Sequence, residues 1–342
     1  MGTGPRPGPD APPDSRRARG AVNDAGTPRH WTLTPPVEFA IYVVARVLLA
    51  ALQAFGRDSA RTGRLLGGLM RIFDRRHVRI ARRNLERAGL PSSLLPGIFE
   101  NLGRCVAELA AVPRLVAQRS FRRHVRLERF DVFDRLLALG RGAIVAIGHQ
   151  ANYELAGLGV AAAGYPIRSL ARPIVNRWVD RYVDGLRKRT GQLILPREGA
   201  LGQMIRSLRA NEMLVVQIDL DAKGDGLLVD FFGRPASAHR SPAVLSLKYG
   251  APIVLVEMIR EGRMQVARAH DPIYPDPYRS ASDPVHALTQ AVNAAFEATV
   301  RSRPAEWWWV IDRWRGADKR LSHGEAGGAG DRPSVPPGGN GI

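Results

Sequence analysis

The sequence of 342 residues has a single cysteine, Cys105, which excludes an intrachain disulfide framework and fits a reducing compartment. It also lacks a Cys/His cluster at metal-ligand spacing, and no glycine-rich phosphate loop follows a strand. We therefore expect neither a metal ion nor a cofactor. Because Cys105 lies in an Ala-, Val- and Leu-rich helical stretch, we interpret it as a buried apolar thiol rather than a nucleophile.

Acidic residues are scarce relative to basic ones, since 32 Asp and Glu against 50 Lys and Arg give a net charge of +18. Such a surplus indicates a polyanionic partner: a nucleic acid, an anionic membrane surface or an acidic protein. Ten arginines lie between Arg57 and Arg87, directly after the apolar stretch 37–55, where arginine side chains can hold lipid phosphates. No nucleic-acid-binding module is recognisable and no aromatic residues interleave with this cluster.

The ends of the chain differ in composition from its centre. Residues 1–30 are rich in Pro, Gly, Asp and Arg, and residues 317–342 in Gly and Pro, so we expect both segments to be disordered tails. Residues 37–56 are expected to anchor the chain to a membrane. Arg46 lies in the middle of this stretch and would cost about 3 kcal/mol at mid-membrane, so a single span and a monotopic amphipathic helix both remain open. No signal-peptide cleavage site follows.

Predicted strands and helices alternate from residue 142 onward, after a mainly helical segment 60–139. This alternation predicts an α/β fold with a mixed central sheet covered by helices, preceded by an N-terminal helical membrane-anchoring region. The candidate strands are 143–147, 167–170, 193–195, 213–218, 227–232, 253–258, 264–267 and 307–311. The candidate helices are 155–163, 175–189, 200–209, 241–249 and 284–302.

The most informative segment is Gly-His-Gln-Ala-Asn-Tyr-Glu at 148–154, which places His149 and Glu154 five positions apart. A predicted buried strand ends directly before it, so His149 falls where side chains project into the cleft of an α/β sheet. Residues five apart in one helix point about 140° apart, so the pair converges only if His149 stays in the loop. A neutral imidazole there can take a proton from an alcohol. Taken alone, a His-x4-Glu pattern more often reflects an ordinary loop histidine followed by an acid in the first turn of a helix than a catalytic pair.

Three further segments accompany this motif: Asp219-Leu220-Asp221, Val-Asp-Phe-Phe-Gly-Arg-Pro-Ala at 229–236, and Arg-Pro-Ala-Glu-Trp-Trp-Trp at 303–309 with Arg313-Trp314. In this order, over residues 40 to 316, they resemble the bacterial lipid A biosynthesis acyltransferases, the late lauroyl/myristoyl transferases. They also resemble the actinobacterial relatives that acylate phosphatidylinositol mannosides. Leu220 stands where the lipid A enzymes usually have Gln. The resemblance implies a glycerol-phosphate acyltransferase-like fold, with residues 57–316 as the acyltransferase domain and 148–154 as the His-x4-Glu motif.

The resemblance implies acyl transfer from a thioester to a hydroxyl group, with His149 as the base. Glu154 is the acid of the motif. Asp219 is a second candidate acid, because it follows the predicted strand 213–218 and would emerge at the same sheet edge; a turn role for it is equally open. We expect Glu154 to orient the site and Asp219 to assist the base. Arg172 matches an Arg-Pro of the family and is the candidate for stabilising the carbonyl oxygen.

The predicted substrate-binding residues lie in the family segments or on the helix between them: Asn152, Arg187, Arg189, Phe231, Phe232, Gly233 and Arg234. Arg187 and Arg189 are expected to face an anionic phosphopantetheine or glycolipid phosphate. The two phenylalanines suit an acyl-chain groove, although such a pair at a strand end is more often core. The glycine allows a close approach of the backbone to a ligand, and Arg234 can clamp a phosphate. The tryptophans of 307–309 fit either the core or a membrane interface.

These features predict a membrane-associated O-acyltransferase on the cytoplasmic face of the bacterial inner membrane. The expected acceptor is a lipid A precursor, and the expected donor is acyl carrier protein, whose acidic surface suits a basic face, or acyl-CoA. An acceptor that is a mannosylated phospholipid or another lipid alcohol is the alternative. A basic nucleic-acid-binding protein is a distant third, and it rests on the charge alone.

Overall fold

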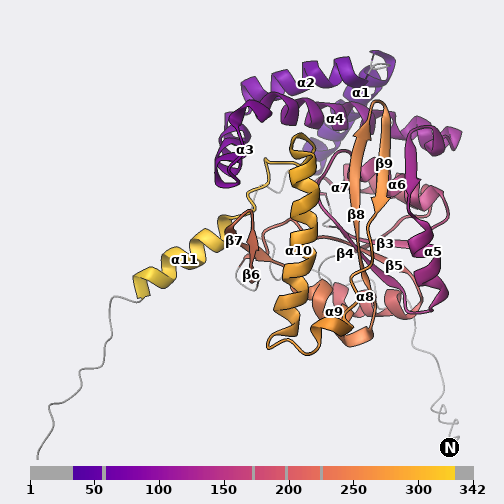
Figure 1. The fold of residues 1–342 in the computed structure, drawn as a ribbon. Coiled ribbons are helices and arrows are strands. Elements are labelled where there is room, and N and C mark those ends of the chain that lie inside the picture. The colour runs from indigo at the N-terminus through magenta and orange to yellow at the C-terminus, as the bar shows by residue number, and fades with distance from the viewer. Residues whose placement is uncertain (1–33, 56–58, 172–173, 197–198, 224–225, 328–342) are drawn as a thin grey trace, which may run out of the picture.

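The computed structural model describes residues 34–55, 59–171, 174–196, 199–223 and 226–327. A seven-stranded sheet with the order β1-β9-β8-β2-β5-β3-β4 forms its centre (Figure 1). All neighbouring strands pair in parallel except β8 and β9, which are antiparallel, so the predicted mixed sheet is confirmed. The strands are β1 (Val125–Glu128), β2 (Ala143–Ile147), β3 (Ile167–Ala171), β4 (Leu193–Pro196), β5 (Met213–Gln217), β8 (Ile253–Glu261) and β9 (Met264–Ala269).

Helices cover both faces of the sheet, which explains why β2 is an unbroken apolar run with every residue buried. Successive side chains of a strand point to opposite faces. Ile144 and Ala146 pack with one set of helices, and Val145 and Ile147 pack with the other. The first set is α8 (Ala200–Arg209), α9 (Ser241–Tyr249) and α10 (Pro284–Ser302), and the second is α5 (Asp131–Ala138) and α6 (Tyr153–Ala162). Helix α7 (Arg177–Thr190) packs beside α6 and β4.

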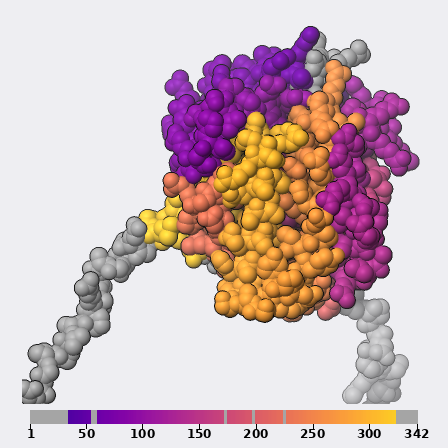
Figure 2. Space-filling model, in the orientation of Figure 1, coloured from indigo at the N-terminus to yellow at the C-terminus, as the bar shows by residue number. Residues whose placement is uncertain are grey.

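Four helices precede the sheet and gather at one end of the molecule (indigo in Figures 1 and 2): α1 (Pro35–Phe55), α2 (Ser59–Phe73), α3 (Arg75–Arg87) and α4 (Leu95–Gln118). Helices α2 and α4 cross closely at Gly63, Gly67 and Gly103. A side chain at any of these positions would overlap the opposing helix, so glycine permits the close crossing. Helix α1 lies along α4 and α7. Of the expected tails, residues 1–30 and 328–342 lie outside the described residues.

Helix α1 is fastened to the body near both of its ends. The Glu38 carboxylate lies 3.1 Å from Nε of Arg177 on α7, and Asn176 Nδ2 donates to the Glu38 carbonyl at 2.7 Å. At the other end, Gln53 Nε2 donates to the carbonyl oxygen of Ala110 on α4 at 2.5 Å. In length and composition, α1 is the one helix in the described part of the chain that qualifies as a membrane span.

Two sequence predictions about secondary structure were wrong. Residues 307–311 do not form a strand; Trp307 makes one isolated bridge to Gln150, after a short 3-10 turn at Pro304–Glu306. The predicted strand 227–232, by contrast, is confirmed as β6 (Leu227–Phe231), which pairs with β7 (Arg234–Ala238) in a separate two-stranded hairpin. Residues 317–327 belong to helix α11 (Arg315–Gly327) rather than to a loose tail, since Ala317 is buried and Arg320 Nη1 donates to the Gly226 carbonyl at 2.6 Å.

Candidate active site

A histidine and an aspartate meet at the carboxyl edge of the two central parallel strands. Strands β2 and β5 pair with Ile147 opposite Gln217, so the residues two positions beyond each, His149 and Asp219, emerge side by side. Nδ1 of His149 lies 2.8 Å from Oδ1 of Asp219, and the His149 backbone N–H donates to Oδ2 at 2.8 Å. Trp307 Nε1 also donates to Oδ2, at 2.8 Å. The carboxylate is therefore held by three donors.

The same contacts set the protonation of the pair. Burial alone lowers the pKa of His149, but the charge of Asp219 and its hydrogen bond outweigh burial and raise that pKa above its ordinary value. Burial alone raises the pKa of Asp219, which is fully enclosed, but the charge of His149 and the three hydrogen bonds lower it. An ionised carboxylate only accepts, so Nδ1 carries the hydrogen and Nε2 is left as the acceptor. Within the described residues, Nε2 has no hydrogen-bond partner.

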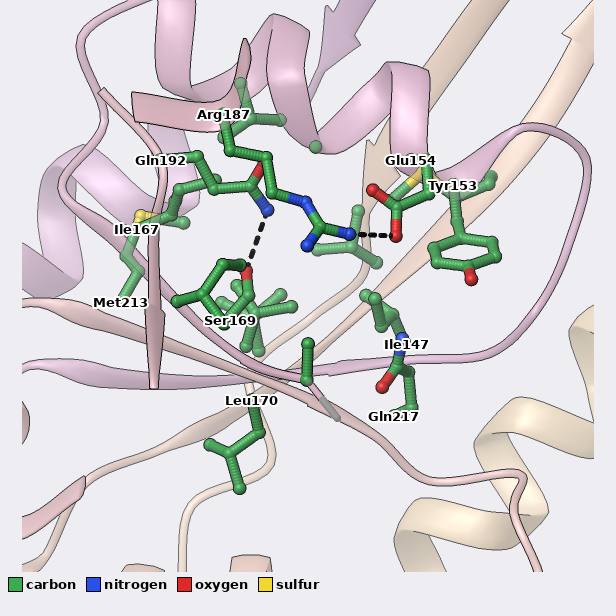
Figure 3. A pocket seen from close by; sticks show the side chains of 18 of the residues that line it. Ile147, Tyr153, Glu154, Ile167, Ser169, Leu170, Arg187, Gln192, Met213 and Gln217 are labelled. Carbon is green, nitrogen blue, oxygen red and sulfur yellow. Dashed lines mark hydrogen bonds and ion pairs between the residues drawn. The ribbon is translucent and has the colours of Figure 1, made fainter. Parts of the chain in front are cut away.

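Glu154 does not contact the imidazole; it forms an ion pair with Arg187 instead. Glu154 lies in the first turn of α6, and its Oε1 accepts from Nη2 of Arg187 on α7 at 2.8 Å (Figure 3). Its charge still contributes to the raised pKa of His149, but only after burial and Asp219. Asp219 is therefore the acid that contacts His149, and Glu154 instead links α6 to α7.

An apolar pocket lies between α6 and the sheet, beneath the Glu154–Arg187 pair (Figure 3). Its lining includes Tyr153, whose ring centroid lies 4.7 Å from that of His149. Most of the other lining side chains are aliphatic and come from the sheet: Val145, Ile147, Ile167, Met213, Val215, Val256 and Met258. Gln192 and Ser169 are hydrogen-bonded to each other at 3.0 Å on one side of it. Such a lining suits an alkyl chain better than a polar ligand.

Of the remaining predicted site residues, those that the structure describes do not line this pocket. Arg172 lies outside the described residues. Arg189 is exposed. Arg234 is also exposed, and its Nε donates to the carbonyl oxygen of Arg87 at 3.1 Å. Gly233 has a φ of 71° in the tight turn between β6 and β7, a conformation that glycine adopts without strain.

The two phenylalanines of the hairpin belong to the core. Phe231 is fully buried and Phe232 is 6% exposed. Phe231 stacks on Phe296 of α10 at 5.9 Å, and Phe232 packs edge-to-face against Trp309. The expected acyl-chain groove is therefore not formed by this pair, because the aromatic side chains of 307–314 and α10 cover it.

The tryptophan segment reaches the site in a way that the sequence did not predict. Trp307 is fully buried and donates to Asp219, and Trp308 lies beside the imidazole of His149 with 5.6 Å between ring centroids. A buried indole N–H needs an acceptor, and this requirement is the signal that could have linked a Trp-rich segment to a buried acid. Arg313, also fully buried, donates to the carbonyl oxygen of Leu220, the residue after Asp219.

Asn152 is buried and caps helix α6, with its Oδ1 accepting from the Leu155 N–H at 3.1 Å. Its Nδ2 donates to Glu108 on α4 at 3.0 Å, so its side chain is satisfied within the protein. Nothing in these contacts gives it a substrate-facing role. In the described part of the chain, no group of three or more His, Cys, Asp or Glu side chains is arranged to hold a metal ion.

A buried His–Asp dyad lies beside an apolar pocket at the carboxyl edge of an α/β sheet, and this arrangement suits the transfer of an apolar acyl group with the help of a general base. The comparison with known proteins is specific. The model of the bacterial lipid A biosynthesis acyltransferase family matches residues 27–316. The chain therefore belongs to this family, and it is an acyltransferase.

Curated relatives give the same class. The chain is 27% identical over 248 residues to a phosphatidylinositol mannoside acyltransferase from Mycobacterium tuberculosis, a match that covers 68% of this chain and 76% of the relative. It is 28% identical over 249 residues to a protein of the same name from Mycolicibacterium smegmatis, covering 68% of this chain and 78% of that one. The sequence prediction of the family is confirmed.

Proposed function

We propose that the protein transfers a fatty acyl chain from a thioester to a hydroxyl group of a membrane glycolipid, with His149 as the general base. The hydroxyl oxygen attacks the thioester carbonyl carbon while its proton passes to Nε2. The carbon–sulfur bond then breaks, and the departing thiolate takes that proton from the imidazolium. Asp219 fixes the tautomer and stabilises the imidazolium. The observation that carries this proposal is the 2.8 Å contact between Nδ1 and the enclosed Asp219 carboxylate.

The apolar pocket beneath the Glu154–Arg187 pair is our proposed site for the acyl chain. Tyr153 lines this pocket and contacts the His149 ring, so the pocket lies next to the imidazole. Most of its wall is formed by aliphatic side chains of the sheet. Arg187 stands at its polar side and would face the thioester end of the donor. Arg172, from the family's Arg-Pro, remains the candidate for holding the negative charge that develops on the carbonyl oxygen.

For the acceptor, we favour a mannosylated phospholipid over a lipid A precursor. Both M. tuberculosis and M. smegmatis relatives carry the name phosphatidylinositol mannoside acyltransferase, and each match covers more than two thirds of both chains. Leu220, in place of the Gln usual in the lipid A enzymes, agrees with this choice. A lipid A precursor is the second candidate, supported by the family match. Either acyl carrier protein or acyl-CoA can serve as donor, since a basic surface suits both anions.

We further propose that α1 and α2 dock the enzyme in plane on the cytoplasmic face of the inner membrane. Both helices present apolar side chains to solvent: Val44 is 57% exposed, Val47 62%, Leu65 65% and Phe73 78%. Because α1 is fastened to the body at Glu38 and at Gln53, a monotopic helix fits this arrangement better than a span. The arginines of α2 and α3 would then meet anionic lipid phosphates.

The first test is mass spectrometry of total glycolipids from cells with and without the gene. Loss of one acyl unit from mannosylated phospholipids supports the favoured acceptor, and the same loss from lipid A replaces it with the second candidate. Purified protein with acyl-CoA or acyl carrier protein then gives the donor. His149→Ala should abolish transfer while the protein stays folded; activity within about tenfold of the wild type would remove His149 as the base, because such groups contribute ~10²–10⁴-fold.

A further inference from the structure

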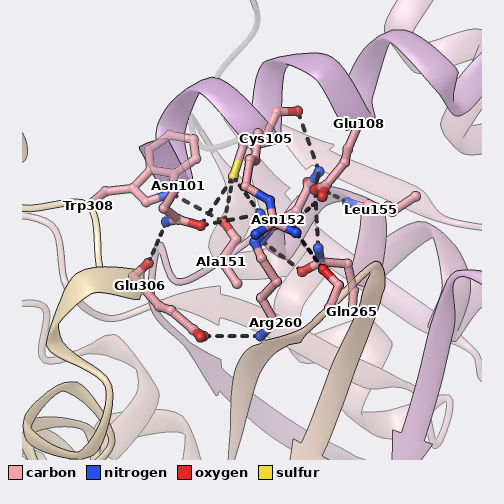
Figure 4. Close-up of polar contacts among 12 residues, drawn as sticks. Asn101, Cys105, Glu108, Ala151, Asn152, Leu155, Arg260, Gln265, Glu306 and Trp308 are labelled. Atoms are coloured by element: carbon pink, nitrogen blue, oxygen red, sulfur yellow. Dashed lines mark hydrogen bonds and ion pairs between the residues drawn. The ribbon is translucent and has the colours of Figure 1, made fainter. Parts of the chain in front are cut away.

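A cluster of buried polar side chains holds the loop of the candidate base from the side opposite Asp219. It joins α4 to strands β8 and β9 and to the loop 148–152 (Figure 4). Its charged members are Glu108 of α4, Arg260 of β8 and Glu306 of the tryptophan segment, and its uncharged members are Asn101, Cys105, Asn152 and Gln265. We propose that the Glu108–Arg260 ion pair and Gln265 act as a positioning device for His149; this proposal rests on the proposed role of His149 as the base.

The cluster holds Asn152 and Ala151, two of the three residues between His149 and helix α6. The backbone N–H of Asn152 donates to Oε1 of Gln265 at 3.2 Å. Oε2 of Glu108 accepts from Nδ2 of Asn152 at 3.0 Å and from Nε2 of Gln265 at 3.1 Å. Glu108 Oε1 in turn forms the ion pair with Arg260 Nη1. The two donors of Asn152, its backbone N–H and its side-chain NH₂ group, are thus held from β9 and α4, while its side-chain oxygen caps α6.

Ala151 is held as firmly from the same side. Its carbonyl oxygen accepts from Cys105 Sγ at 3.0 Å and from Trp308 Nε1 at 3.2 Å. Its N–H donates to the Glu306 carbonyl at 2.9 Å, and the Glu306 carboxylate accepts from the Arg260 backbone N–H at 3.1 Å. Ala151 has a φ of 42°, which a residue other than glycine adopts only when its surroundings impose it.

Stability does not explain this cluster. The side chains of Arg260 and Glu108 are only 6% and 9% exposed, and a buried ion pair seldom stabilises a fold more than apolar side chains of the same size. The presence of a buried ion pair at this position therefore needs an explanation other than stability. Asp219 holds Nδ1 and the backbone N–H of His149, and the Trp308 N–H donates to the His149 carbonyl at 2.9 Å. The chain then runs on to Ala151 and Asn152, so the position of the imidazole relative to a substrate also depends on how these two residues are held. A displacement of about 1 Å at a reacting group can cost a hundredfold in rate.

The decisive variant is the double substitution Glu108→Leu with Arg260→Met, which replaces the ion pair by apolar side chains of similar volume. We expect its melting temperature to fall by several degrees but the fold to persist, because Asn152 Nδ2 and Gln265 Nε2 lose the Glu108 acceptor while the ion pair itself is replaced by apolar packing. We expect kcat to fall at least tenfold while KM for the acyl donor stays within about threefold, because the apolar pocket is untouched. The acid limb of the pH profile should move to lower pH, since the contact with Asp219 that raises the pKa of His149 is loosened.

A role in folding alone predicts a different result: a folded double variant would then keep wild-type kcat and an unchanged acid limb, and this outcome overturns the proposal. Leu136→Ala, which removes a buried side chain of α5 outside the site, is the matched control for destabilisation. Should the double variant not fold, Gln265→Met serves instead, because it releases the Asn152 N–H without leaving a charge unpaired. A kcat within twofold of the wild type in Gln265→Met likewise overturns the proposal.

The failure of this proposal can be told from a failure of the proposed function by measuring His149→Ala in parallel. If His149→Ala remains active, His149 is not the base, and the positioning of its loop has no catalytic meaning. If His149→Ala is inactive and the double variant is fully active, the chemistry stands and only the positioning role is lost.

Discussion

Asp219→Asn is the substitution for which the structure predicts the largest effect at the least change in shape. In the wild-type chain, Oδ2 accepts from the His149 N–H and from Trp307 Nε1, and Oδ1 faces Nδ1 of the imidazole. The amide oxygen of asparagine can take over the two bonds to Oδ2. Its NH₂ group then faces Nδ1, which must accept, so the ring hydrogen moves to Nε2 and the base has no lone pair for the incoming hydroxyl group.

The expected loss in kcat is about 10³–10⁴-fold, or about 4–5 kcal/mol in the activation barrier, because a wrong tautomer removes general-base catalysis almost entirely. The free energy of unfolding should change by only about 1–3 kcal/mol, since the lost charge-assisted hydrogen bonds are offset by the relief of burying a carboxylate. Steady-state transfer of a labelled acyl chain measures the first quantity, and urea unfolding measures the second.

The matched control is Asp221→Asn, the same substitution two residues further on. Asp221 Oδ1 accepts from the backbone N–H of Lys223 and does not touch the imidazole. We expect its kcat to stay within about threefold of the wild type. If Asp219→Asn also stays within tenfold while it folds normally, the assignment of Asp219 as the partner of the base is refuted.

Three further predictions follow from burial and exposure. The kcat/KM for acyl transfer should rise with pH through the raised pKa of His149, because only the neutral ring is a base; an acid limb at or below the ordinary histidine range contradicts this. Burial raises the pKa of Cys105 to about 12, so iodoacetamide at pH 8 should label this thiol only after denaturation. Rapid labelling of the native protein would contradict the burial of Cys105. Val47→Asp combined with Leu65→Asp should weaken sedimentation with anionic vesicles at least tenfold, and unchanged sedimentation would exclude α1 and α2 as the docking surface.

Local patterns were sufficient for much of the fold. The uniformly apolar strand 143–147, the candidate helix 284–302 and the alternation after residue 142 predicted β2, α10 and a mixed sheet, and these are confirmed; Asp283 caps the helix. Each depends on a period or a cap that a few consecutive residues specify. The family segments likewise placed a base at one strand end and an acid at another, and parallel strands bring such ends to one edge.

Where a signal was not local, the sequence was insufficient. Strand β1 alternates apolar and charged residues over only four positions, and β7 carries charged and small residues, so neither gives a clear strand signal, and pairing with β9 and β6 makes them strands. The run 307–311 has the composition of a strand, but its indoles pack into the aromatic core, and one N–H donates to Asp219. At residues 307–311, packing in the whole domain outweighs the local preference for a strand.

The sequence by itself determined the class of the protein, and it predicted the candidate base and two acids as possible partners for it. Only the tertiary structure decided between those acids. Glu154 is close to His149 in the chain, but it enters α6 and turns toward Arg187 on α7, whereas Asp219 is 70 positions away and lies opposite the imidazole because β2 and β5 are neighbours. A hydrogen bond depends on distance in space, and sheet order, which no short stretch of sequence encodes, sets that distance.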